Sequence, residues 1–179
     1  MFRLIQNIDD IVIVRIAKLH SPIKNKIMIA FSTAGNMGLV WFAICLPFLI
    51  NAPWRATGAN IIFGLCVAHL MGEIIIKHIV RRTRPCHDLK DEEQIINKPK
   101  YYSFPSGHTT ASFSVVGVTM LRCNEPVILS VLCLALLIGF SRLYLRVHYL
   151  SDVVAGACLG LICGWASVSI FEHLVASFF

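Results

Sequence analysis

The fold is decided by residues 126–171, which read PVILSVLCLALLIGFSRLYLRVHYLSDVVAGACLGLICGWASVSIF. Two apolar runs flank a short polar link that carries Ser141-Arg142, His148 and Asp152. Apolar runs of this length are typical of membrane-spanning helices. The whole chain agrees, because 56% of its residues are hydrophobic and only 15% are charged, with a mean hydropathy of +0.71. That balance lies outside the range of soluble domains. We therefore predict an all-α integral membrane helical bundle.

Further uncharged stretches lie upstream of these two runs, bounded by charges, Pro or turn residues. Together they give about five transmembrane helices, at residues 27–50, 56–76, 107–121, 126–140 and 153–171. The third and fourth are short. Nothing in the 179 residues suggests a linker. We therefore expect residues 1–179 to form a single membrane-embedded domain.

Residues 1–25 differ from the spans, because charges such as Asp9, Asp10 and Arg15 interrupt apolar positions at helical spacing. This pattern lacks the uninterrupted apolar core of a signal peptide. It predicts an amphipathic helix lying in the membrane interface. A helix packed on the side of the bundle is the alternative.

Gly156, Gly160 and Gly164 recur at steps of four in the last predicted span. Such a ridge lets another helix approach closely. The partner is either another helix of the bundle or a second copy of the chain, which would make a homodimer.

Five spans place three polar segments on the same side of the membrane. These are the N-terminus, residues 77–105 and the link at 141–152. Lys77, Arg81 and Arg84 would share one face at i, i+4 and i+7 if the second span continued as a helix. Their charges suit phosphate oxygens. A basic membrane flank that binds lipid headgroups is the alternative.

Pro105-Ser106-Gly107-His108 precedes an apolar helix. Ser106 is a natural N-cap, and Gly107 permits close backbone approach. Unpaired N–H groups at the helix start would then face an anion. His108, one step inside, can protonate a leaving oxygen. A simple helix cap is the alternative.

His148 and Asp152 lie four residues apart. On one helical turn the carboxylate can accept the proton of one ring nitrogen and leave the other nitrogen free as a nucleophile or base. Arg142, six residues earlier, could close on the same phosphate. A capped helix start with Asp152 in its first turn is the alternative.

Together the segments KHIVRRTRP from Lys77, PSGH from Pro105 and SRLYLRVHYLSD from Ser141 resemble the membrane branch of the type 2 phosphatidic acid phosphatase family. The family pattern is KxxxxxxRP, PSGH and SRxxxxxHxxxD, and every motif position is kept. The family shares its site with bacterial acid phosphatases and vanadium haloperoxidases. Its members similar to this chain include bacterial undecaprenyl-diphosphatase and phosphatidylglycerophosphatase B.

The resemblance implies a role for each matching residue. Lys77, Arg84 and Arg142 would hold the phosphate oxygens, assisted by Ser106 and the Gly107 amide. His148 would form a phosphohistidine, Asp152 would orient and stabilise it, and His108 would protonate the leaving group. Fixed positive charge would stabilise the transferring phosphoryl group, so we expect neither a metal nor a cofactor.

The implied substrate is a phosphorylated membrane lipid in the bilayer, not a nucleic acid. We expect a polyprenyl diphosphate such as undecaprenyl diphosphate. Phosphatidic acid and phosphatidylglycerophosphate are the alternatives. Two other classes remain open, a vanadate-dependent haloperoxidase and a non-catalytic protein that binds lipid phosphate.

Two features lie outside the motifs. His69, Glu73 and Lys77 form a polar stripe on the second span. Glu73 either neutralises Lys77, or serves a proton or water path or a headgroup contact. The loop that follows ends in Tyr101-Tyr102, which we expect at the membrane interface, over the site.

The expected location is the plasma membrane, with two conflicting indications of the catalytic face. Of the 16 Lys and Arg residues, 14 fall on the predicted site side. That bias favours the cytoplasmic side. The resemblance to bacterial relatives favours the outer face.

Overall fold

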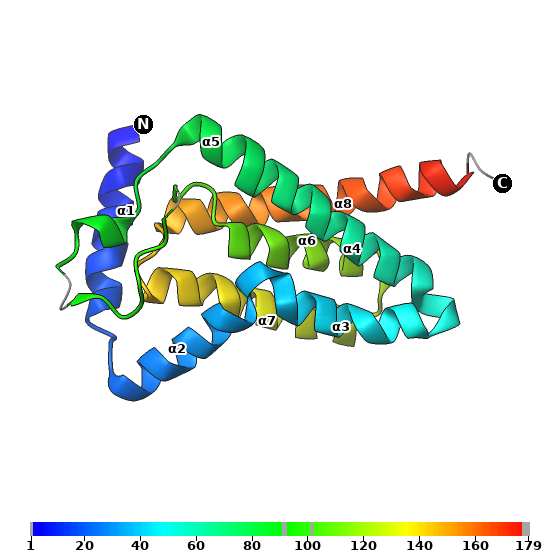
Figure 1. Cartoon of the computed structure of the whole chain (residues 1–179), viewed down its shortest axis with the longest axis horizontal. Helices are drawn as coiled ribbons and strands as arrows, with labels where there is room; N and C mark the ends of the chain where they lie inside the picture. The colour runs from blue at the N-terminus through cyan, green and yellow to red at the C-terminus, as the bar shows by residue number, and fades with distance from the viewer. Residues whose placement is uncertain (1, 91–92, 101, 177–179) are drawn as a thin grey trace.

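The computed structural model describes residues 2–90, 93–100 and 102–176, and its regular elements are helices (Figure 1). Tyr101 lies outside these residues. The predicted all-α membrane bundle is confirmed. Its α-helices are α1 (Phe2–Ala17), α2 (Pro22–Ala34), α3 (Leu39–Ile50), α4 (Arg55–His69), α5 (Lys77–Val80), α6 (Gly107–Arg122), α7 (Glu125–Tyr144) and α8 (Leu150–Ala176). Shorter helical segments are η1 (Asn36–Gly38), η2 (Ala52–Trp54), η3 (Leu70–Ile76), which is a π-helix, and η4 (Pro85–Asp88).

Helix α6 lies at the centre of the bundle and packs against α4, α7 and α8. It is rich in buried hydroxyl side chains, which bond to carbonyls of the preceding turn. Thr110 Oγ1 donates to Ser106 O at 3.0 Å, and Ser112 Oγ donates to His108 O at 2.7 Å. Because these hydroxyls are satisfied within the helix, α6 can be polar and still occupy the interior.

The outer helices present apolar side chains to their surroundings. Leu129 on α7 and Ile162 on α8 are each 59% exposed. Within the described residues, three helices are long and apolar enough to cross a membrane: Ala52–Val80, Glu125–Tyr144 and Leu150–His173. The pair α2 and α3 passes the same test together. Since α6 has 16 residues and is mostly buried, the count of five spans stays a prediction.

The first predicted span, 27–50, is wrong as one continuous helix. The chain bends by 53° between α2 and α3. Met37 and Gly38 in η1 take left-handed φ values of 52° and 71°, which an α-helix does not accommodate. The bend brings η1 against the start of α6.

Helix α1 crosses the end of the bundle at which α7 ends and α8 begins (Figure 1). It buries Asp9 and Ile16 and exposes Leu4 and Ile11. Helix α1 thus packs on the bundle, as in the alternative, while the position of its exposed apolar side in the membrane interface stays a prediction. The predicted limit at residue 25 is wrong, because α1 ends at Ala17 and Ser21 caps α2 by accepting a hydrogen bond from Lys24 N.

The glycine ridge of α8 lies against α6. A Cβ atom built on Gly160 would lie 2.4 Å from Thr110 O, and one on Gly164 would lie 2.3 Å from Ser114 O. The packing interpretation is therefore confirmed. Because α6 of the same chain occupies this ridge, the ridge is not free for a second copy, and dimerisation itself stays a prediction.

Candidate active site

The three sequence motifs meet at one cavity of about 1050 Å³. Its walls come from the α2–α3 bend, the long helix that contains η3, the start of α6 and the link between α7 and α8. Six of the eight predicted site residues line it: Lys77, Arg84, Gly107, His108, Arg142 and His148. The other two, Ser106 and Asp152, are fully buried behind this surface.

Three cations converge on the cavity, although their side chains are almost completely buried. Lys77, Arg84 and Arg142 are 3%, 4% and 5% exposed. Burial of like charges is costly unless an anion offsets them. Burial also lowers the pKa of the Arg84 guanidinium. The arrangement is therefore suited to receiving an anion such as phosphate.

Arg84 reaches the cavity by a route different from the predicted one. Helix α5 ends at Val80, and Arg81 takes a left-handed φ of 52° and lies exposed, with its Nε donating to His78 O. The predicted common face of Lys77, Arg81 and Arg84 is thus wrong. The chain turns back, and Ser103 holds the returning segment through bonds to Arg82 O and Thr83 O.

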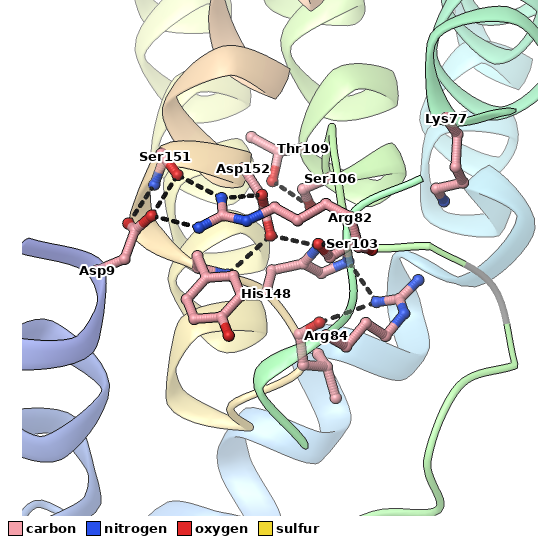
Figure 2. Close-up of polar contacts among 12 residues, drawn as sticks. Asp9, Lys77, Arg82, Arg84, Ser103, Ser106, Thr109, His148, Ser151 and Asp152 are labelled. Atoms are coloured by element: carbon pink, nitrogen blue, oxygen red, sulfur yellow. Dashed lines mark hydrogen bonds and ion pairs between the residues drawn. The ribbon is translucent and has the colours of Figure 1, made fainter. Parts of the chain in front are cut away.

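His148 lies in the link between α7 and α8 and is 2% exposed. Its Nε2 is 2.9 Å from Arg84 Nη1, which also donates to Val147 O at 2.9 Å (Figure 2). Because a guanidinium can only donate, Nε2 is the acceptor and the neutral ring carries its proton on Nδ1. Burial lowers the pKa of His148 well below its ordinary value, and the cations of Arg84, Arg142 and Lys77 lower it further. The ring is therefore neutral at pH 7.

Asp152 lies in the first turn of α8, on the Nδ1 side of His148. Its Oδ2 is 3.6 Å from Nδ1, which is an ion-pair distance longer than a hydrogen bond. The same oxygen accepts from Tyr149 N at 2.9 Å, as an N-terminal carboxylate commonly does. Oδ1 accepts from Arg82 Nη1 at 2.8 Å. The predicted pairing of His148 with Asp152 is present as this looser contact.

The start of α6 is tied to α8 rather than capped by its own serine. Ser106 N donates to Asp152 O at 3.0 Å, and Ser106 Oγ accepts from Thr109 Oγ1 at 2.9 Å. Ser106 is the N-cap residue, but its hydroxyl bonds to no backbone amide of the helix. Ser106 is therefore the N-cap residue, as predicted, and because Thr109 takes up its hydroxyl, the hydroxyl caps no amide of the helix start.

Glu73 projects from the π-helix η3 into the cavity. Its Oε1 is 2.5 Å from Lys77 Nζ, which confirms that Glu73 neutralises Lys77. A Cβ atom on Gly107 would lie 1.8 Å from the same oxygen. A negative oxygen thus already lies at the start of α6, where an incoming anion would be received.

Four residues that sequence reasoning did not assign also shape the site. Asn36 Oδ1 lies 2.8 Å from His108 Nε2, Ser32 Oγ accepts from Arg142 Nη1, and Arg82 bonds to both Asp152 and Asp9. Asn36 and Ser32 come from the bent helix pair, for which the sequence predicted one span. Asp9 and Arg82 carried no signal except their charge, and each has a neighbour of the same charge in the sequence, Asp10 and Arg81.

Comparison with known proteins agrees with this geometry. Residues 57–175 match the model of the PAP2 superfamily. The undecaprenyl-diphosphatase of Sulfolobus acidocaldarius is 30% identical over 148 residues, which cover 82% of this chain and 70% of the relative. The decaprenylphosphoryl-5-phosphoribose phosphatase of Mycobacterium tuberculosis is 35% identical over 138 residues, covering 73% and 71%.

A solved structure gives the same fold. The crystal structure of LpxE from Aquifex aeolicus superposes with a TM-score of 0.78 at 25% identity, covering 90% of this chain and 94% of that one. The bundle, the cationic cavity and these matches define a lipid phosphatase embedded in the membrane. The chain belongs to the PAP2 superfamily, which confirms the resemblance carried by the three motifs.

Proposed function

We propose that this protein removes the terminal phosphate of a polyprenyl diphosphate, such as undecaprenyl diphosphate, through a phosphohistidine on His148. The observation that carries the proposal is the 2.9 Å contact between His148 Nε2 and Arg84 Nη1. It means that the ring directs a lone pair, not a proton, toward the cations. A buried neutral imidazole held in this way is a nucleophile ready for an electrophilic phosphorus.

In the first step, oxygens of the terminal phosphate bind Lys77, Arg84 and Arg142, and the Gly107 amide adds a donor. The Nε2 lone pair of His148 forms a P–N bond while the P–O bond to the rest of the lipid breaks. The electron pair of that bond leaves on the bridging oxygen, which takes a proton from the His108 ring, charged once the anionic phosphate lies beside it. The fixed cations stabilise the charge that develops on the transferring group.

In the second step, neutral His108 takes a proton from a water molecule whose oxygen attacks phosphorus. The P–N bond breaks, and its electron pair returns to Nε2 of His148. Between the two steps the phosphorylated ring is positively charged, and the nearby Asp152 carboxylate stabilises it. The products are inorganic phosphate and a lipid with one phosphate fewer.

The walls of the cavity support a lipid with a long apolar chain. Exposed apolar side chains continue from the cations toward the outside of the bundle, including Met37, Phe42, Leu70 and Ile74. The names of the two relatives from Sulfolobus acidocaldarius and Mycobacterium tuberculosis both specify polyprenyl-linked phosphates. We therefore favour a polyprenyl substrate in the plasma membrane over phosphatidic acid or phosphatidylglycerophosphate.

The test is phosphate release by the detergent-purified protein with EDTA present, from undecaprenyl diphosphate, phosphatidic acid and phosphatidylglycerophosphate in parallel. We expect the fastest release from undecaprenyl diphosphate and an acid-labile phosphoenzyme that is trapped in the wild type. His148→Ala should abolish both. His173→Ala is the matched control, because His173 is exposed near the other end of α8.

Each contrary result has a distinct meaning. Release by His148→Ala at the wild-type rate would refute the phosphohistidine. Faster release from a glycerolipid would refute the polyprenyl substrate but keep the mechanism. Tight binding of all three lipids without release would favour the non-catalytic alternative.

A further inference from the structure

A buried charge network outside the three motifs joins α1 to the candidate active site (Figure 2). Asp9 of α1 is 1% exposed. Arg82, in the segment between α5 and η4, donates from Nη2 to Asp9 Oδ2 at 2.7 Å and from Nη1 to Asp152 Oδ1 at 2.8 Å. One guanidinium therefore bridges a carboxylate of α1 and a carboxylate of the site.

Asp9 is also bound to the first turn of α8. Ser151 N donates to Asp9 Oδ1 at 2.9 Å, and Ser151 Oγ donates to Asp9 Oδ2 at 2.5 Å. An N–H at a helix start lacks a partner within its own helix, so Asp9 acts as a cap supplied by another helix. Arg82 is held further by its guanidinium, which lies 4.0 Å from the centre of the Tyr149 ring.

We infer that Asp9 is a positioning residue for the proposed phosphoryl transfer, acting through Arg82 on the Asp152 carboxylate that faces His148. The inference rests on the proposed function. Arg82 fixes Oδ1 of Asp152, and Tyr149 N fixes Oδ2. With both oxygens held, the carboxylate cannot turn, and Oδ2 stays beside His148 Nδ1.

The charge balance of the network gives Asp9 a second effect. Burial by itself would lower the pKa of Arg82, but its contacts with Asp9 and Asp152 raise that pKa above the ordinary value. Arg82 therefore stays charged and divides its attraction between two carboxylates. Without the charge of Asp9, Arg82 would act on Asp152 alone and weaken the field that stabilises the positively charged phosphohistidine ring.

The test compares Asp9→Asn with Asp10→Asn in the full-length protein. Asp10 is the matched control, because it is exposed on the same helix and its oxygen accepts from Gln6 Nε2, a bond that an asparagine oxygen can keep. We expect Asp9→Asn to lower kcat by roughly 10- to 100-fold, as a misoriented catalytic group does. KM should stay within about twofold, because the phosphate-binding cations are untouched.

A double mutant separates positioning from mere stabilisation. If Asp9 acts through Asp152, adding Asp9→Asn to Asp152→Asn should cause no further loss of kcat. If the loss of kcat in the double variant equalled the product of the losses in the two single variants, the inference would be overturned. So would an Asp9→Asn protein that melts at a lower temperature but has the kcat of Asp10→Asn. If Asp9→Asn does not fold, Arg82→Lys takes its place, since a lysine cannot bridge two carboxylates with a planar fork.

A second readout keeps this test separate from that of the proposed function. The ¹⁵N signals of the His148 ring should shift in Asp9→Asn and stay unchanged in Asp10→Asn. If the wild type releases no phosphate from any lipid, the proposed function fails, and the shift still tests whether Asp9 sets the surroundings of His148. An unchanged ring signal in Asp9→Asn would overturn the inference in either case.

Discussion

Replacing Gly160 by alanine should separate the two helices that carry the halves of the site. The added Cβ would lie 2.4 Å from Thr110 O and 2.7 Å from Phe113 Cβ, where ordinary contact begins at 3.4 Å. Because the Thr110 oxygen belongs to the backbone of α6, no side-chain rotation relieves the clash. Helices α6 and α8 must therefore move apart by about 1 Å.

The expected magnitude follows from two opposing effects. Overpacking of a close-packed interior costs about 1–3 kcal/mol, whereas alanine is roughly 1 kcal/mol better than glycine inside a helix. A backbone clash lies toward the upper end of the first range, so we expect a net loss of about 1–2 kcal/mol. The separation also strains the Ser106 N to Asp152 O bond of 3.0 Å, so phosphate release should fall as well.

Gly139→Ala is the matched control. Gly139 on α7 also faces α6, but its added Cβ would lie 3.6 Å from Thr109 Cγ2, an ordinary contact. The melting temperature can be measured in detergent with size-exclusion chromatography as the readout. We expect the melting temperature of Gly160→Ala to lie below that of the wild type, and that of Gly139→Ala to equal or exceed it. A Gly160→Ala protein as stable and as active as the wild type would refute the close packing of α6 on α8.

Three further predictions concern the cavity itself. Glu73→Gln should lower the inhibition constant of inorganic phosphate by up to about fivefold, which corresponds to the free energy of a partly exposed ion pair. An unchanged inhibition constant would contradict competition between Glu73 and the anion. Arg84→Lys should lower kcat on the order of 100-fold or more, because an ammonium cannot span Val147 O, His148 and phosphate as a fork does; kinetics near the wild-type rate would contradict this. The His148 ring should remain neutral as the pH falls through 6.5. ¹⁵N NMR of the histidine rings can check this, with His148→Ala used to assign the signal. Since the unfolded chain takes up that proton first, the free energy of unfolding should fall as the pH drops below about 6.5, whereas a ring that titrates at its ordinary value would refute the burial argument.

The boundaries of the interior helices could be predicted where the chain marks them. The stretch expected at residues 107–121 corresponds to α6, Gly107–Arg122. Its start could be predicted because the PSGH motif marks the beginning of the helix. The bend between α2 and α3 could not be predicted from apolar length, since both halves are apolar. It depends on the left-handed backbone of Met37 and Gly38, which a hydropathy pattern does not register.

Spacing failed where it assumed that a helix continues. The common face of Lys77, Arg81 and Arg84 required helix through Arg84, but a residue before proline is pushed out of the α region. Arg84 is followed by Pro85 and has an extended backbone. It reaches His148 from a loop that returns over the site, so the same residue was correctly placed at the cavity for the wrong geometric reason.

The sequence by itself determined the class of protein and the residues of the cavity, because apolar length and fixed motif spacing are local properties of the chain. It also determined that His148 and Asp152 lie four residues apart, although the structure places His148 in the link before α8 rather than on the helical turn that carries Asp152. Only the tertiary structure decided which surfaces meet: α6 against the glycine ridge, Asn36 beside His108, Glu73 beside Gly107, and Asp9 joined through Arg82 to Asp152. These contacts join segments as far apart as α1 and α8. Their geometry depends on how the helices pack, which no local pattern specifies.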